Sequence, residues 1–421
     1  MAYQAKSGTW LTARRLRAHA LLLGLALWSV YVWTLATPGC RDRNGNLKGT
    51  DFLHFYTLGC LAEAHRGTGL YDMNAQAAVA AERVPAAAGI RYLPLYPPQV
   101  SLLFAPLAHL SYGWALAIWW IFSAPAYGVC CYAVWRVCPQ LHNHGGTIAL
   151  LAAAFPAFFH LVAWGQTSAL ALAFFTIAFL LLRNRCDFLA GLAFGCLIFK
   201  PQLGLALAIV FVAIGAWKMV SGVVLSAAAQ LSIGVLYYGT DALRTWVRML
   251  FSVPSVLPSF EPRPYQTHCL RTFWTMIVPW PPVSSALYGI SAVVVLGLTI
   301  ALWLRPAPLA LRFSALLLAT VLVAPHLTVY DLVILAPAML LLADWLLSQD
   351  LSPATGRMGT LLYLVYVLPL VGPLARWTHL QLSVIAMSAL LYCTVQASWA
   401  RSSPEKSLTT KDANAHEGLS C

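Results

Sequence analysis

The stretch YGWALAIWWIFSAPAYGVCCYAVW, residues 112–135, contains no charged side chain from one end to the other. About 20 consecutive apolar residues are enough for a helix to cross the hydrocarbon core of a bilayer, so this stretch predicts a membrane span. Similar apolar stretches recur along most of the chain. Within lipid only helices and closed barrels satisfy their backbone hydrogen bonds. The sequence therefore predicts an all-α polytopic membrane protein.

The overall composition supports this prediction. Hydrophobic residues make up 60% of the 421 residues and charged residues only 10%, which leaves too little polar surface to cover one large soluble core. The net charge of +12 raises the question of nucleic acid, but the basic residues are scattered singly in loops and form no basic stripe. We therefore expect membrane lipids, and no nucleic acid, as partners.

Basic residues also predict the topology. Arg14, Arg15 and Arg17 precede the first apolar stretch, 18–36, and place residues 1–17 in the cytoplasm. That stretch resembles a signal peptide but lacks a clean A-x-A cleavage site, so we interpret it as an uncleaved first span. The pattern predicts a bundle of about twelve transmembrane segments with both ends in the cytoplasm. The expected spans are 18–36, 112–135, 147–164, 167–182, two segments within 188–217, 220–238, 284–304, 309–324, 332–347, 359–372 and 380–400.

The segment 188–217 is unusual in length. Thirty residues of helix measure about 45 Å, too long for one span and too short for two full ones. Proline breaks a helix at the residue before it, so Lys200-Pro201 predicts two short or tilted segments with an outward apex. Two larger outer loops are expected at 38–98 and 239–282, each carrying interfacial helices. The polar tail 401–421 is expected to be disordered.

The ten cysteines give no sign of a metal site, because they include no CxxC pair and no zinc spacing. Most lie in apolar runs, where a thiol behaves as a small hydrophobe. Cys40, Cys60 and Cys269 fall in the expected outer loops, and the sequence leaves open whether they form a disulfide. No metal is expected.

The first outer loop contains KGTDFLHFY, residues 48–56, with an acid before an aromatic run. Apolar residues and a glycine recur after the acid at helical spacing: Phe52, Phe55, Tyr56 and Gly59. This spacing predicts an amphipathic helix in the plane of the membrane surface. Asp51 then has two interpretations, a helix N-cap or a general base, and one residue can serve as both. Asp72 is expected to be the N-cap of a second interfacial helix.

Further polar residues interrupt apolar sequence at the same predicted face, where such groups are costly and usually functional. They are Tyr96, Gln166, Lys200, His326 and Asp331. Each has a simpler explanation: Lys200 can extend to the membrane surface, and Asp331 can pair with a cation or cap a helix. Together, a carboxylate and two cations suit a reaction that expels a phosphate, because the cations neutralise the leaving group while the carboxylate takes a proton from a hydroxyl.

At this point the sequence resembles the GT-C superfamily of membrane glycosyltransferases and, within it, glycosyltransferase family 87, of the polyprenyl-phosphate-mannose-dependent α-mannosyltransferase type. Six strings in order carry the resemblance: GTDFLHFY (49–56), GTGLYD (67–72), YPPQVSLLFAPLA (96–108), WGQTSALALA (164–173), FKPQLGL (199–205) and APHLTVYDLVIL (324–335). The resemblance covers residues 45–347, so we expect a catalytic membrane domain at 18–347. Residues 348–400 add only transmembrane segments.

The resemblance implies an inverting hexosyltransferase of the inner membrane that takes a sugar, mannose by analogy, from a polyprenyl-phosphate donor. Its active site would face the periplasm or cell exterior, and its acceptor would be a lipid or a glycan. Asp51 matches the catalytic acid that the GT-C pattern places in the first outer loop, and His326 matches a histidine near the donor phosphate. A substrate-binding role for Lys200 is a physical inference of our own. No cofactor is expected, since a monophosphate donor needs no metal.

Two other functions remain open on the sequence. A transporter or lipid flippase of envelope biogenesis also suits twelve spans and a broken helix, but it predicts charges along a midplane pathway. The apolar segments are almost free of charge, with Asp344 as the main exception. A non-catalytic scaffold protein would keep the fold without needing Asp51.

Overall fold

The computed structural model describes residues 12–260 and 263–399. These residues are predominantly helical and contain no β-strand, apart from two isolated bridges that join Arg41 to Leu47 and Thr267 to Thr328. The prediction of an all-α protein is therefore confirmed. The expected tail, 401–421, lies outside the described residues.

Seven helical segments in the described ranges are long and apolar enough to cross a membrane. They are α1 (Ala13–Leu35), α5 (Tyr112–Trp135), α11 (Trp217–Tyr238), α14 (Pro281–Trp303), Val329–Leu347, Pro353–Thr378 and α19 (Leu382–Trp399). Two of these segments contain more than one helix. The segment Val329–Leu347 consists of η7 (Val329–Leu335) and α16 (Ala336–Leu347). The segment Pro353–Thr378 consists of α17 (Pro353–Val367), η8 (Leu368–Leu374) and α18 (Ala375–Thr378). An eighth candidate is bent by 46° where Pro139–Ala153 meets Pro156–Trp164; it comprises η4 (Pro139–His144), α6 (Gly145–Ala153) and α7 (Pro156–Trp164).

The expected count of about twelve spans is not confirmed. Four apolar segments of the described chain are shorter: α8 (Ser168–Arg183), Asp187–Phe199, α10 (Pro201–Ala213) and α15 (Leu309–Val323). The 13 residues of α10 rise only about 20 Å, less than the hydrocarbon thickness of a bilayer. α15 is buried in the bundle at 12 of its 15 residues, and burial gives a helix the same apolar composition as a membrane span. The other three segments are only partly buried and also expose large apolar side chains such as Ile177, Phe188 and Leu205.

The predicted break at Lys200 is confirmed. α9 (Asp187–Gly195) continues into η5 (Cys196–Phe199), Lys200 leaves the helical conformation with φ −131° and ψ 72°, and α10 begins at Pro201. Proline suits the first position of a helix, where its missing N–H has no partner to lose. The break places Lys200 at a turn between two short helices.

Glycines allow α9 to lie directly against α11. A Cβ added to Gly191 would come within 2.1 Å of the Met219 carbonyl oxygen, and one on Gly222 within 2.3 Å of the Phe188 carbonyl oxygen. Small residues at such positions let helix backbones approach closely, which is the usual way that helices associate in lipid. This contact fixes α9, and with it the turn that carries Lys200.

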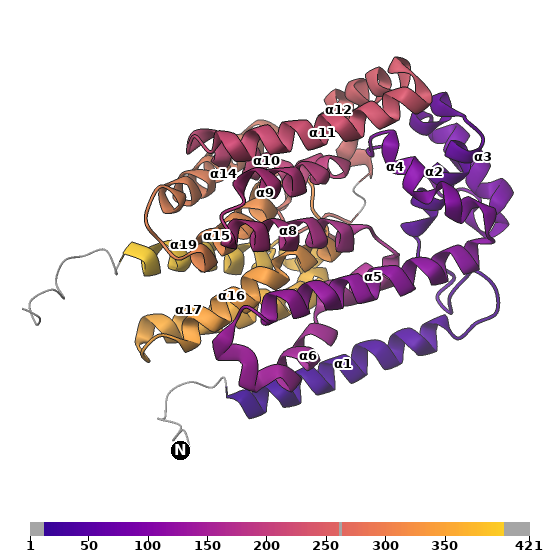
Figure 1. Cartoon of the computed structure of the whole chain (residues 1–421). Coiled ribbons are helices and arrows are strands. Elements are labelled where there is room, and N and C mark those ends of the chain that lie inside the picture. Colours follow the sequence, from indigo (N-terminus) through magenta and orange to yellow (C-terminus); the bar gives the residue numbers. More distant parts are fainter. Residues whose placement is uncertain (1–11, 261–262, 400–421) are drawn as a thin grey trace, which may run out of the picture.

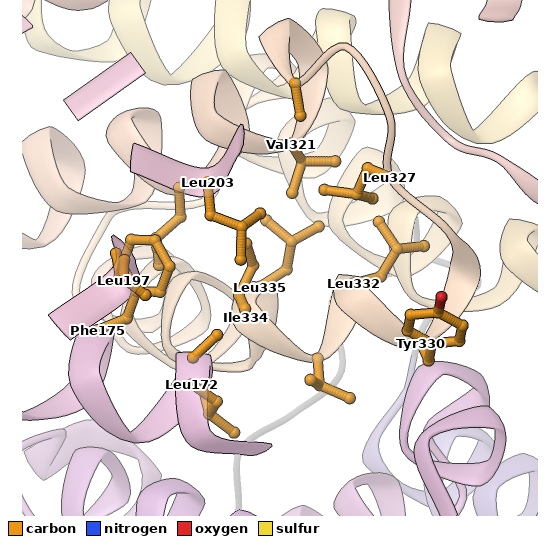
Figure 2. Packing of buried hydrophobic residues seen from close by; sticks show 14 of the residues in the cluster. Leu172, Phe175, Leu197, Leu203, Val321, Leu327, Tyr330, Leu332, Ile334 and Leu335 are labelled. Atoms are coloured by element: carbon orange, nitrogen blue, oxygen red, sulfur yellow. The ribbon is translucent and has the colours of Figure 1, made fainter. Parts of the chain in front are cut away.

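One part of the core lies between the short helices α8, α10 and α15 and the segment η7 (Figure 2). Figure 2 shows buried side chains from α8, η5, α10, α15 and η7 meeting in one cluster; the labelled ones are Leu172, Phe175, Leu197, Leu203, Val321, Leu327, Tyr330, Leu332, Ile334 and Leu335. Tyr330 lies at its edge. The apolar packing thus ends where the polar residues of η7 begin.

Short helices gather at one end of the bundle (Figure 1). They are α2 (Phe52–Glu63), η1 (Gly67–Tyr71), α3 (Met73–Arg83), η2 (Pro85–Ala87), α4 (Gln99–Phe104) and η3 (Ala105–His109). The described start of α1 and the end of α19 lie at the opposite end (Figure 1). Asp72 caps α3, since its carboxylate accepts from the backbone N–H groups of Asn74 and Ala75, as predicted.

The prediction of an interfacial helix after Asp51 is wrong. Every residue of α2 except Glu63 is buried. The helix packs so closely against the end of α4 that a Cβ on Gly59 would lie 2.4 Å from the Phe104 carbonyl oxygen. The helical spacing of the apolar residues predicted that only one face of α2 would be buried. In the structure α4 and η3 pack against α2 as well, so its remaining faces are also covered.

The second outer loop contains α12 (Thr240–Phe260), η6 (Pro264–Gln266) and α13 (Leu270–Ile277). α12 buries Ala242 and Trp246 but leaves Phe251 83% exposed. An exposed apolar side chain on a helix with arginines nearby is typical of the membrane surface. The interfacial prediction therefore stays a prediction for α12.

Candidate active site

A cavity of ≈780 Å³ opens at the end of the bundle where α2 begins. Its walls come from the loop before α2, the turn between α7 and α8, the break before α10 and the start of η7. All the site residues predicted from the sequence line this cavity: Asp51, Tyr96, Gln166, Lys200, His326 and Asp331. Segments far apart in the chain thus meet in one site.

Asp51 immediately precedes α2, and its side chain does not cap that helix. Its backbone N–H donates to the Trp164 carbonyl oxygen at 3.0 Å, which ties the start of α2 to the end of α7. The carboxylate Oδ2 instead accepts a hydrogen bond from Gln166 Nε2 at 2.7 Å. The N-cap interpretation of Asp51 is therefore wrong, and its carboxylate faces the cavity.

Burial raises the pKa of Asp51 to about 6. Three partners lower this pKa: Gln166 through its hydrogen bond, Lys200 through its positive charge and Tyr330 through a hydrogen bond. The negative charge of Asp331 raises the pKa further. Desolvation disfavours the charged carboxylate, and these partners limit the effect. A carboxyl with this pKa is mostly ionised at neutral pH yet basic enough to accept a proton.

Gln166 is held by both ends of its amide. Its Oε1 accepts from the Thr167 backbone N–H at 3.2 Å and from Lys200 Nζ at 3.4 Å, so its Nε2 is directed at Asp51. The residue before it, Gly165, has φ +70°, and a Cβ there would lie 2.6 Å from Cβ of Phe52. Only glycine fits this turn, which brings Gln166 next to Asp51.

Lys200 is buried and does not extend to the surface. Its ammonium donates to Asp331 Oδ1 at 2.7 Å, Ser168 Oγ at 2.9 Å and Gln166 Oε1, which engages its three N–H groups. The side chains of Lys200 and Asp331 are 3% and 4% exposed. Buried charges occur when they are paired in this way. Lys200 also lies 5.3 Å from the centre of the Tyr330 ring.

Asp331 forms the ion pair that the sequence offered, with Lys200 as the cation. It is not the N-cap of a helix that begins at Leu332: η7 begins at Val329 with Thr328 as its N-cap, and Asp331 completes the capping box from the third position of η7. Ser168 Oγ donates to the same Asp331 oxygen that Lys200 binds, at 2.5 Å. The ion pair and Ser168 therefore join α8, the break before α10 and η7 in the wall of the cavity.

Tyr96 and His326 lie on other parts of the cavity wall. The Tyr96 ring packs 4.8 Å from that of Phe55, and the half-buried His326 follows α15 just before η7. Both residues come from segments that the sequence placed at the same face.

Sequence reasoning missed other polar residues of the cavity. Arg91 and Arg263 are exposed cationic residues in its wall, and Tyr92 and His54 line it as well. Arg91 and Tyr92 lie five and four positions before Tyr96, so their place in the first outer loop was the available signal. His54 was hidden within an aromatic run that suggested only apolar packing.

The described residues contain no group of three or more His, Cys, Asp or Glu side chains suited to a metal ion. The cysteines of this part of the chain, Cys40, Cys60 and Cys269 included, form no disulfide with one another. The disulfide that the sequence left open is therefore not formed.

The model of glycosyltransferase family 87 matches residues 95–325, just over half of the chain. The chain belongs to glycosyltransferase family 87. The matched region includes Tyr96, Gln166 and Lys200, whereas Asp51 precedes it and His326 follows it. No curated protein and no solved structure matched the chain.

Family 87 membership and the apolar helices together identify a membrane-bound glycosyltransferase. The transporter alternative is not favoured, because the matching family is one of enzymes that transfer sugars. The cavity is the site at which the described chain brings its predicted polar residues together.

Proposed function

We propose that this family 87 glycosyltransferase transfers a hexose, mannose by analogy, from a polyprenyl-phosphate donor to a lipid or glycan acceptor, with Asp51 as the general base. The observation that supports it is the position of the Asp51 carboxylate. It lines a cavity of ≈780 Å³ beside a buried Lys200–Asp331 pair, and burial brings its pKa to about 6. Such a carboxylate is suited to accept a proton at neutral pH.

In the proposed reaction, a hydroxyl group of the acceptor attacks the anomeric carbon of the donor from the side opposite to the phosphate. The new C–O bond forms as the bond from that carbon to the phosphate oxygen breaks, which inverts the configuration. The hydroxyl proton passes to Asp51, and the departing polyprenyl phosphate keeps the electron pair. Asp51 would then release its proton to water.

The departing phosphate needs positive charge that is still available to bind it. Lys200 has its three N–H groups engaged, so in this arrangement it acts on the site through its charge and through Gln166. Arg91 and Arg263 are exposed in the cavity wall and carry positive charge for this role. We propose that these two arginines bind the phosphate, and that His326, which also lines the cavity and matches the family's histidine near the donor phosphate, contacts it as well. Tyr96 and Asp331 would complete the substrate-binding wall.

The orientation is part of the proposal. Arg14, Arg15 and Arg17 belong to the first turns of α1. α1 begins at the end of the bundle opposite to α2 (Figure 1), and the cavity opens at the start of α2. Arginines beside a first span favour the cytoplasmic side. The cavity would then face the periplasm or cell exterior from the inner membrane. Transfer is expected to proceed without a metal, so a chelator should leave the rate unchanged.

The decisive experiment compares Asp51→Asn with wild-type protein. The purified proteins are incubated with a panel of radiolabelled polyprenyl-phosphate sugars and a membrane-lipid extract, and labelled product is measured. Loss of a general base typically costs about 10²–10⁴-fold in rate, so product formation should fall to that extent. Asp42→Asn is a matched control, since Asp42 lines the same cavity but holds the backbone N–H groups of Asn44 and Asn46.

Folding is monitored by thermal unfolding. Asp51→Asn should unfold at a temperature equal to or above that of the wild type at neutral pH, because it removes a charge whose burial is unfavourable. A folded Asp51→Asn protein that transfers sugar at the wild-type rate would refute the role of Asp51. A wild-type protein that transfers no sugar from any donor would refute the donor class.

A further inference from the structure

A second cavity, of ≈180 Å³, lies apart from the candidate active site and shares no lining residue with it. Its walls come from α1, α5, α6, α16 and α17, which lie together in the lower part of the view in Figure 1. Leu16, near the start of α1, lines it, and so do Cys131 and Ala343, four residues before the ends of α5 and α16. The cavity is therefore placed near the end of the bundle opposite to α2.

The wall of this second cavity is apolar. The hydroxyls of Tyr127 and Tyr366 donate to backbone carbonyl oxygens of α6 at 3.0 and 2.9 Å, and that of Tyr363 lies 2.9 Å from His19 Nδ1. The other lining residues are aliphatic residues, one phenylalanine, one methionine, one glycine and one cysteine. Apolar cavities of about 150 Å³ hold no water and bind apolar molecules instead. The expected occupant is therefore an apolar chain.

Basic residues lie at the edge of this wall. Leu16 of the wall is followed by Arg17, whose Nε and Nη2 donate to Thr147 Oγ1 at 3.2 and 3.1 Å, and Thr147 directly precedes Ile148 of the wall. Arg14 lies one turn earlier on the same face of α1, and the side chains of both arginines are exposed. A guanidinium has five N–H groups, so after the two bonds to Thr147 three remain without a partner among the described residues.

We propose that the second cavity binds one acyl chain of a phospholipid with an anionic headgroup, and that Arg14 and Arg17 hold the phosphate of that headgroup. Basic pockets between transmembrane helices suit such headgroups. The lipid would also fill space beside α1, a helix of which only Ala20 is buried. A bound chain would contact α1 and α17 at once and so stabilise the folded bundle.

A polyprenyl phosphate has the same chemical parts, a phosphate and an apolar chain, but the geometry favours a phospholipid. In the proposed reaction the donor must bring its phosphate to the active-site cavity, which opens at the start of α2. Arg14 and Arg17 belong to the start of α1, at the opposite end of the bundle (Figure 1). The second site therefore takes its lipid from the other leaflet. This inference does not depend on the role of Asp51.

Binding is measured on the purified full-length protein in detergent, after its native lipids have been removed. Phosphatidylglycerol, phosphatidylcholine with the same acyl chains and polyprenyl phosphate are added separately. The rise in unfolding temperature with lipid concentration gives an apparent Kd for each, because a ligand that binds only the folded state stabilises it. We expect phosphatidylglycerol to bind about tenfold more tightly than phosphatidylcholine. Equal affinities would refute the anionic headgroup, and tighter binding of polyprenyl phosphate would refute the choice of a phospholipid.

The headgroup contacts are tested with the double variant Arg14→Gln/Arg17→Gln. Its affinity for phosphatidylglycerol should fall about tenfold or more, to near that for phosphatidylcholine. Arg183→Gln/Arg305→Gln is the matched control, since it removes the same charge from two exposed arginines that do not line the cavity. The control should keep the wild-type affinity. An equal loss in both double variants would show that phosphatidylglycerol responds to the total charge, and the proposed site would be wrong.

The acyl-chain site is tested independently with Ala152→Phe, which places a ring in the cavity, and Ala149→Phe, at an exposed position of the same helix. Ala152→Phe should lower the affinity for phosphatidylglycerol about tenfold, the loss expected when part of an apolar chain is excluded, while Ala149→Phe should keep it. Without lipid, the unfolding temperature of each variant shows whether it is folded. A folded Ala152→Phe protein with the wild-type affinity would place the lipid outside the cavity and overturn the inference. If Ala152→Phe does not fold, the arginine variants decide the result.

Discussion

Asp51 is placed in the cavity by its backbone. The hydrogen bond from its N–H to the Trp164 carbonyl oxygen holds the start of α2 against α7, and the side chain is then free to face Gln166. Gln166 is oriented in turn by Lys200 and by the Thr167 backbone. Gln166 therefore links the buried ion pair to the proposed base.

The pH dependence of transfer should follow Asp51. Its pKa lies at about 6, raised by burial, with Gln166, Lys200 and Tyr330 opposing the increase and Asp331 adding to it. Transfer needs the deprotonated carboxylate, so kcat/KM should fall tenfold for each pH unit below about 6 and level off above it. The measurement is kcat/KM for the acceptor between pH 4.5 and pH 8. A rate that stays constant down to pH 4.5 would contradict this assignment.

The Lys200–Asp331 pair should show strong coupling. Removing one partner leaves a buried charge without compensation, so Lys200→Met should lower the free energy of unfolding by about 3–5 kcal/mol. The double variant Lys200→Met/Asp331→Asn should recover most of that loss, because no unpaired charge remains. Denaturant unfolding of the single and double variants in detergent measures the coupling. Strictly additive effects would show that the pair contributes little.

At the scale of elements, the break at Pro201 and the spans of regular length could be predicted from the sequence. Apolar length and proline are local signals, and α5 begins and ends at the residues expected, 112 and 135. The short helices could not be separated from spans, because a helix buried by protein is as apolar as one that faces lipid. For the same reason α2 was mistaken for an interfacial helix.

The contact between α9 and α11 gives a prediction at this scale. A side chain at Gly191 would collide with the Met219 carbonyl oxygen, so Gly191→Val should push the helices apart and lower the free energy of unfolding by about 1–3 kcal/mol. Gly204→Val is the matched control, since a Cβ at this helical glycine would meet nothing within 4 Å. The test is thermal or denaturant unfolding in detergent. Equal losses in both variants would show that only helix propensity had changed.

For the whole molecule, the orientation in the membrane can be tested by labelling. Asn44 lines the cavity, and Asp350 is exposed in the turn between α16 and α17. In intact cells, a membrane-impermeant maleimide should label Asn44→Cys, and it should label Asp350→Cys only after the membrane is permeabilised. The protein without added cysteine gives the background from native thiols. The reverse pattern would place the cavity on the cytoplasmic side.

The sequence by itself determined that the chain is helical and apolar enough for a membrane, where its long spans lie, and which polar residues interrupt them. These properties depend on composition and on neighbours in the chain. Tertiary structure alone decided that the side chain of Asp51 binds Gln166 rather than capping α2, that Lys200 is paired with Asp331, and that the unpaired His54 lines the cavity. The first two outcomes depend on partners more than 100 positions away in the chain, and the third depends on the lack of a hydrogen-bond partner for His54. A local pattern of residues predicts neither kind of outcome.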